Sequence, residues 1–163
     1  MTRIRFQQSL DELKENLLVM AGLAEQAIQR AIEAYRVRDL SICDLVSRSE
    51  NAINRMERDI DQAALDLLAM EQPMAVDLRF ILSVIKINAD LERVGDSAKS
   101  ISDRVRSMEQ MAVAELPVDI PKMATLAAEM VRKSLQAFSD ADAEIAREVL
   151  TMDEAVDEMN RAA

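Results

Sequence analysis

Apolar residues recur at alternating three- and four-residue steps along most of the chain, and this spacing limits the possible folds more than any other feature. The first run extends from Phe6 to Ala34, about four heptads, which corresponds to one helix of roughly 45–50 Å. Two further runs cover residues 42–70 and 84–108. Only 2 glycines and 3 prolines occur in 163 residues, whereas β-sandwiches and parallel α/β folds need turn residues much more often. The spacing therefore predicts an all-α protein.

Short connections separate the three helices predicted in residues 1–108. The first run stops near Arg38, and either Asp39 or Ser41 can cap the helix that follows. Pro73 ends the second run, because proline inside a helix loses a hydrogen bond and clashes with the preceding turn. Long helices joined by short connections are antiparallel neighbours. We therefore expect residues 1–108 to form an up-down-up three-helix bundle.

Residues 20–58 match residues 123–161 without gaps at a constant offset of 103. Eleven positions are identical, among them Asp39 and Asp142, which lie at an inter-helix turn and outside the apolar seams. The organisation predicted is a first bundle over 1–108, a linker over 109–121 and a partial second bundle over 122–163. This partial repeat is a helical hairpin without a counterpart of the third helix. We expect either a longer protein or completion of the second bundle by another segment.

Histidine is absent and Cys43 is the only cysteine. Triads and dyads that depend on histidine, imidazole zinc sites and disulfide frameworks are therefore excluded for this chain. The net charge of −10 argues against general affinity for nucleic acid. No run of 18 apolar residues and no signal-peptide core occurs in the sequence. We expect an intracellular protein without direct membrane insertion.

The predicted third helix carries one acidic pair that is a candidate cation-binding site. Glu92 and Asp96 stand one helical turn apart, where two carboxylates repel each other unless a cation lies between them. The sequence contains eight acidic pairs at this spacing, against about five by chance for its composition, so on the pattern alone a solvated acidic face is the favoured explanation. Gly95 lies between them in sequence. A glycine inside a helix costs about 1 kcal/mol relative to alanine, which indicates close approach of a neighbouring helix or a ligand.

The segment from Gln72 to Arg79 reads QPMAVDLR, and the segment from Asp90 to Asp96 reads DLERVGD. Together these two motifs resemble the signature of the PhoU family of phosphate-uptake regulators. The resemblance extends over essentially the whole chain and includes the tandem repeat. It implies a cytoplasmic, non-catalytic adaptor between a phosphate ABC transporter and a sensor histidine kinase, which represses the phosphate-starvation response. Two alternatives stay open: a carboxylate-based metal store or buffer, and a PhoU-like regulatory domain of a larger transporter.

The resemblance also implies surface metal sites for iron, zinc, magnesium or manganese, none of them required for the fold. Family members bind such ions through E/D-x-x-x-D motifs, and the positions that match are Glu92 and Asp96, Asp153 and Asp157 and, more weakly, Glu50 and Asn54. Ser97 stands where the family usually has histidine, which leaves oxygen donors only. Residues with an expected structural or partner-binding role are Asp77, Arg79, Asp90, Arg93 and Gly95.

The apolar seam of the predicted hairpin, residues 122–163, indicates self-association of the chain. This seam matches positions that a third helix covers in the first bundle, and it comprises Leu126, Met130, Leu135, Ile145, Val149, Val156 and Met159. A contiguous apolar surface of this kind exceeds what a soluble monomer normally exposes. We expect a homodimer in which two hairpins form a four-helix bundle. In the alternative arrangements the hairpin completes a neighbour by domain exchange, or folds back on the first bundle.

Overall fold

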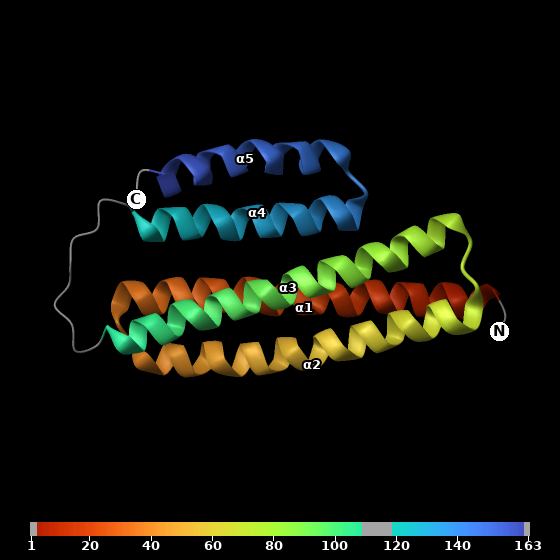
Figure 1. Ribbon diagram of the computed structural model, residues 1–163, viewed down its shortest axis with the longest axis horizontal. Helices are drawn as coiled ribbons and strands as arrows, with labels where there is room; N and C mark the ends of the chain where they lie inside the picture. The colour runs from red at the N-terminus through yellow and green to blue at the C-terminus, as the bar shows by residue number, and fades with distance from the viewer. Residues whose placement is uncertain (1–2, 109–118, 162–163) are drawn as a thin grey trace.

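The computed structural model describes residues 3–108 and 119–161, and within these ranges it consists of helices and short turns. Three long helices, α1 (Arg3–Val37), α2 (Leu40–Glu71) and α3 (Ala75–Ser107), form an up-down-up bundle. Two shorter helices, α4 (Ile120–Asp140) and α5 (Ala143–Arg161), form a hairpin beside it (Figure 1). The all-α prediction is confirmed. Most of the predicted linker, residues 109–118, lies outside the described residues.

The turn between α1 and α2 forms as the sequence predicted. Asp39 is the N-cap of α2, and its carboxylate accepts a hydrogen bond of 2.8 Å from the backbone N–H of Ser41. Hydrogen bonding by the side chain of Ser41, and then by its backbone N–H, holds the pKa of Asp39 below its ordinary value. Arg38 adopts a left-handed conformation with φ 59°, which reverses the chain between the two helices. Asp39 rather than Ser41 is therefore the cap.

The same turn recurs between α4 and α5. Ala141, 103 residues after Arg38, has φ 54°. The carboxylate of Asp142 accepts hydrogen bonds from the backbone N–H groups of Glu144, at 2.8 Å, and Ile145, at 3.2 Å. The two helix–turn–helix units thus share an aspartate cap and a residue in the left-handed conformation at the equivalent position. This agrees with the predicted tandem repeat.

The core of the bundle comes from the predicted seams of α1, α2 and α3. Side chains with at most 1% exposure fill it, among them Leu13, Leu17, Met20, Val46, Ile53, Ile60, Ile81 and Val84. Alanines take over towards the end of α1, where Ala24, Ala27, Ala31 and Ala34 are fully buried and allow the helices to approach closely. Met70 was expected in the second seam and is 65% exposed. That expectation was wrong because α2 ends at Glu71, where no further helix covers its last turn.

Gly95 lies where α3 crosses α2. A Cβ placed on it would stand 3.0 Å from Cδ1 and 3.3 Å from Cγ2 of Ile53, a side chain that is fully buried. Packing between helices thus accounts for this glycine without a ligand.

The α4–α5 hairpin folds back on the first bundle through α4, while α5 lies on the outside (Figure 1). The ammonium of Lys14 donates a hydrogen bond of 2.8 Å to the carbonyl of Ser139 at the end of α4. Phe138 stacks on Phe80 of α3, with ring centroids 5.8 Å apart. The hairpin seam is therefore half-buried rather than bare. The homodimer stays a prediction, with less apolar surface available to it than the sequence suggested.

No helix in residues 3–108 or 119–161 is both long enough and apolar enough to cross a membrane.

Candidate functional site

The first candidate is an acidic face between α2 and α3. Glu92 is half-buried, and Asp96 one turn further along is exposed. Burial of the Glu92 carboxyl, followed by repulsion from Asp96 and from Glu57 of α2, raises the pKa of Glu92 above its ordinary value. The carboxyl group of Glu92 is thus repelled by one carboxyl group of its own helix and by one of the neighbouring helix. Sequence reasoning did not connect Glu57 with this pair, because only the register of α2 against α3 brings them close.

Two asparagines, the buried Asn88 and the half-buried Asn54, lie along the same pair of helices. Asn88 of α3 is fully buried, and its amide donates to the carbonyl of Glu57 at 2.9 Å and to the carboxylate of Asp61 at 3.1 Å. Asn54 of α2 donates to the carboxylate of Glu50 at 2.5 Å. The side-chain oxygens of both asparagines are buried and have no hydrogen-bond partner in the described residues. The two side chains of the weaker predicted pair, Glu50 and Asn54, are therefore hydrogen-bonded to each other.

The second predicted acidic pair lies on α5. Asp153 and Asp157 are both exposed, and Asp157 forms an ion pair of 3.5 Å with Arg161. Over residues 3–108 and 119–161, no three histidine, cysteine, aspartate or glutamate side chains gather closely enough to hold a metal ion. The structure thus keeps the pairs of α3 and α5 apart, and each offers two carboxylates to a cation whose remaining ligands would be water.

The residues of the two sequence motifs occupy different parts of α3. Asp77 lies in its first turn, where a carboxylate favours the positive end of the helix dipole, and Arg79 is exposed. Asp90 and Arg93 form an exposed ion pair with a separation of 3.7 Å. An exposed pair of this length contributes little to stability. The carboxylate of Asp90 is 73% exposed and remains open to other groups.

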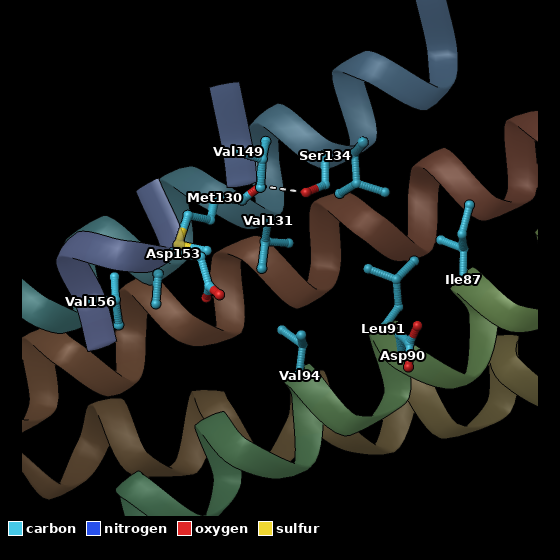
Figure 2. A pocket seen from close by; sticks show the side chains of 12 residues that line it. Ile87, Asp90, Leu91, Val94, Met130, Val131, Ser134, Val149, Asp153 and Val156 are labelled. Carbon is cyan, nitrogen blue, oxygen red and sulfur yellow. Dashed lines mark hydrogen bonds between the residues drawn. The ribbon is translucent and has the colours of Figure 1, made fainter. Parts of the chain in front are cut away.

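The second candidate is an apolar cleft of about 480 Å³ between α3 and the hairpin. Figure 2 shows the lining side chains of α4 and α5 on one side and those of α3 on the other. Its lining residues are Ile87, Asp90, Leu91 and Val94 of α3; Ala127, Met130, Val131, Ser134 and Leu135 of α4; and Val149, Asp153 and Val156 of α5. Among the described residues that line it, Asp90 and Asp153 are the only ionisable ones.

The hairpin wall of the cleft corresponds, at the offset of 103, to the surface that α3 covers in the first bundle. Val46 and Ile53 are fully buried there, whereas their equivalents Val149 and Val156 are half-buried and line the cleft. The repeat was visible in the sequence, and it predicted an uncovered seam. That α3 would supply a facing wall was not predicted, because the docking of α4 on α1 decides it.

Comparison with known proteins agrees with this architecture. The family model for the PhoU domain matches residues 17–105 and 120–163. The phosphate-specific transport system accessory protein PhoU homolog of Aquifex aeolicus is 34% identical over 93% of this chain and 69% of its own length. The homolog of Pseudomonas aeruginosa is also 34% identical, over 94% of this chain, and the chain spans 64% of that protein's length.

Two solved structures share the fold. The crystal structure of PhoU from Pseudomonas aeruginosa superposes with a TM-score of 0.93 at 33% identity, covering 97% of this chain and 76% of that one. The phosphate transport system regulatory protein PhoU from Streptococcus pneumoniae has a TM-score of 0.87 at 29% identity, covering 96% of this chain and 74% of its own.

Proposed function

The chain belongs to the PhoU family, and on that premise we propose that it is a regulatory accessory protein of phosphate uptake. The observation that carries the proposal is the similarity over 97% of the chain to a PhoU crystal structure. The relatives are named as accessory proteins of the phosphate-specific transport system. In the proposed role the chain acts on the cytoplasmic side by binding other proteins rather than by catalysis.

The adaptor part of the proposal names a phosphate ABC transporter and a sensor histidine kinase as partners. Long rigid helices suit this role, because they hold separate surfaces at fixed distances. The acidic face lies between α2 and α3, and the apolar cleft lies between α3 and the hairpin. Two partners can therefore occupy different faces of one molecule.

Deletion of the gene tests the regulatory role. In phosphate-rich medium we expect the deletion to raise both the uptake of labelled phosphate and the expression of a phosphate-starvation reporter, and the intact gene to restore both. Cross-linking in cells that carry the intact gene then tests for the transporter and the kinase separately. Uptake and reporter levels that do not respond to the deletion would contradict the regulatory role. Cross-links to neither protein would contradict the adaptor role alone.

The acidic face supports a secondary proposal, that the chain binds a hard divalent cation weakly at Glu92 and Asp96. A cation would offset the repulsion among Glu57, Glu92 and Asp96 that raises the Glu92 pKa. The donors are oxygens only, which suits magnesium or manganese with retained water better than zinc or iron. The pair Asp153 and Asp157 on α5 is the weaker candidate, because Asp157 already pairs with Arg161.

Calorimetry with Mn²⁺ and Mg²⁺ tests this secondary proposal. Replacing Glu92 and Asp96 together by alanine should abolish the binding heat and slightly stabilise the metal-free chain, because the repulsion is removed. The matched control replaces Asp11 and Glu15 of α1, an exposed pair with the same spacing, and should leave binding unchanged. Equal loss in both double variants, or in neither, would remove the Glu92 site.

A further inference from the structure

We propose that the outer face of α2 binds an acidic α-helix of a partner protein through a row of three arginines. The arginine row consists of Arg48, Arg55 and Arg58, and the bound helix carries carboxylates along one face at a matching spacing. The inference deepens the proposed adaptor role, on which it rests, because it names one binding surface and the chemistry of the segment that this surface recognises.

The three arginines line one open hollow of about 570 Å³ together with Asn51 and Asn54. All three arginines are exposed. They are spaced seven and three residues apart, so they follow one side of α2 over about 15 Å at a rise of 1.5 Å per residue. Arg55 and Arg58 are neighbours on the helix surface, where like charges repel each other. Anionic groups placed along the row would remove this repulsion.

The carboxylates of α2 close to the arginine row are engaged with α3 instead. Asp44, one turn before Arg48, forms an ion pair of 2.7 Å with Arg106. Asp61 accepts a hydrogen bond of 3.1 Å from the amide of Asn88. Within residues 3–108 and 119–161, no ion pair involves an arginine of the row. The helix therefore directs acidic groups towards α3 and presents three unpaired cations on its outer face.

The arginine row lies on the side of the first bundle that faces away from the hairpin. Ile53 and Ile60 of α2 are buried in the core, whereas the row lies on the other side of the same helix. Over the described part of the chain α2 packs against α1 and α3 and contacts neither α4 nor α5. In Figure 1, α2 borders one edge of the molecule and α5 the opposite edge. The row is thus separate from the hairpin seam, which is the surface that the repeat leaves without a third helix.

The internal repeat shows that the fold does not require arginines at these positions. At the offset of 103, the row and its two asparagines correspond to outer positions of α5 with a different charge, namely Thr151, Glu154, Asp157, Glu158 and Arg161. Since the two helix–turn–helix units share their cap and their turn, the basic side chains of α2 are not needed to build the unit. They are therefore available for recognition.

The acidic outer face of α5 does not make a second copy of this chain the better occupant. Because α2 and α5 lie at opposite edges of the molecule (Figure 1), pairing the row of one copy with α5 of the next leaves a free face at each end. Such a head-to-tail contact continues into an open filament unless a rotation closes it. The net charge of −10 also makes copies of the chain repel one another. A different protein is thus favoured.

The spacing of the row favours a helix over other anions. A guanidinium group pairs with a carboxylate through two parallel hydrogen bonds, and a compact anion cannot reach three such groups spread over about 15 Å of helix. A long polyanion such as nucleic acid, or an anionic membrane, is repelled by the charge of the whole chain. Acidic residues at three- and four-residue steps lie on one face of a helix, and they can therefore meet the arginines one by one.

The direct test is binding of a labelled, alanine-based helical peptide of about 20 residues to the full chain. Its glutamates lie on one face, at alternating three- and four-residue steps. By fluorescence anisotropy we expect saturable binding below about 500 μM at about 20 mM salt, weakened at least about tenfold at about 300 mM. The control peptide has the same composition with its glutamates spread around the helix, and it should bind at least about fivefold more weakly. Absence of binding, or equal binding of both peptides, would overturn the proposal.

Two triple variants of the protein locate the binding surface. Replacing the three arginines of the row by glutamine keeps helix propensity and should weaken the peptide at least about tenfold. The matched control replaces Arg5, Lys86 and Arg104, three exposed basic residues elsewhere in the bundle, and changes the net charge by the same amount. It should change the affinity less than about twofold. Equal loss in both variants would mean that net charge rather than the row attracts the peptide, and would overturn the assignment.

Further outcomes separate this inference from its rivals and from the proposed function. Self-association in sedimentation equilibrium that the row variant abolishes and the acidic peptide competes away would assign the row to a second copy and overturn the partner helix. Failure of the peptide to bind, with phosphate uptake still derepressed in the deletion, would refute the row but not the regulatory role. Peptide binding that the row variant abolishes, with uptake that does not respond to the deletion, would support the row and refute the regulatory role.

Discussion

The same helix–turn–helix unit occurs twice in this chain and meets two different packing environments. In α1 and α2 the apolar seam is sealed by α3, and residues such as Val46 are fully buried. In α4 and α5 the equivalent seam faces an open cleft, and α5 has no buried residue. Because the cap, the turn and the spacing are shared, the difference lies in what covers the seam. Local sequence is thus enough to form the hairpin, whereas the depth of its core depends on a third helix.

The largest expected difference comes from truncating the two equivalent valines. Val46→Ala should lower the free energy of unfolding by about 2–3 kcal/mol, because it leaves a cavity in a closed core. Val149→Ala should lower it by less than about 1 kcal/mol, because the side chain is half-buried at an open cleft. Urea unfolding followed by circular dichroism measures both values. Equal losses would mean that the two units are packed alike.

The two glycines probe how tightly the first bundle is closed. Gly95→Ala gains about 1 kcal/mol of helix propensity but forces a Cβ to 3.0 Å from Ile53, an overpacking that costs about 1–3 kcal/mol, so we expect a net loss of up to about 2 kcal/mol. Gly22→Ala, where nothing lies within 4 Å of the added Cβ, should stabilise the chain by about 0.5–1 kcal/mol. Thermal melts give the signs. A stabilising Gly95→Ala would show that Ile53 can move and that the contact is loose.

The two capping aspartates test whether the hairpin unfolds independently of the bundle. Asp142→Ala should cost about 0.5–1 kcal/mol through the lost bonds to Glu144 and Ile145. Hydrogen exchange should accelerate in α4 and α5 while the centres of α1–α3 stay protected. Asp39→Ala should instead accelerate exchange at the beginning of α2. Faster exchange across the whole chain after Asp142→Ala would show that hairpin and bundle form one cooperative unit.

The smallest expected effect is that of pH, and it should arise in the first bundle. The pKa of Glu92 is raised, so its contribution is stabilising below the ordinary glutamate value of 4.5 and is lost as the pH rises through the raised value. The pKa of Asp39 is lowered, so its contribution is present above the ordinary value of 3.8 and is lost as the pH falls. With no histidine in the chain, stability should be nearly constant from pH 6 to 8 in chelator.

Glu92→Gln is the variant that checks the sign of this dependence. It should remove the loss of stability just above pH 4.5 and leave the acid side, to which Asp39 contributes, unchanged. Melting temperatures of both proteins between pH 4 and 8 provide the measurement. An identical profile in the two proteins would show that the pKa of Glu92 is not raised in the folded chain.

The sequence predicted most of what is local in this fold. The apolar period marked the apolar face of each helix, and Pro73 marked the end of α2. Asp39 or Ser41 marked the start of α2, and Asp142 matched Asp39 at the start of α5. The family motifs indicated the relationship that the comparisons established. The sequence predicted the functional sites least well, since acidic pairs one turn apart are common in a chain with 30 acidic residues.

The sequence by itself therefore determined the helices and their caps, because these depend on residues within a few positions of one another. It also determined the repeat and the family, because both follow from the order of residues alone. Only the tertiary structure decided what each apolar face contacts. It placed Glu57 beside Glu92, docked α4 on α1 and left α3 as the second wall of the cleft. Periodicity shows that a helix has an apolar face, but the element that covers this face is chosen by packing between residues far apart in the chain.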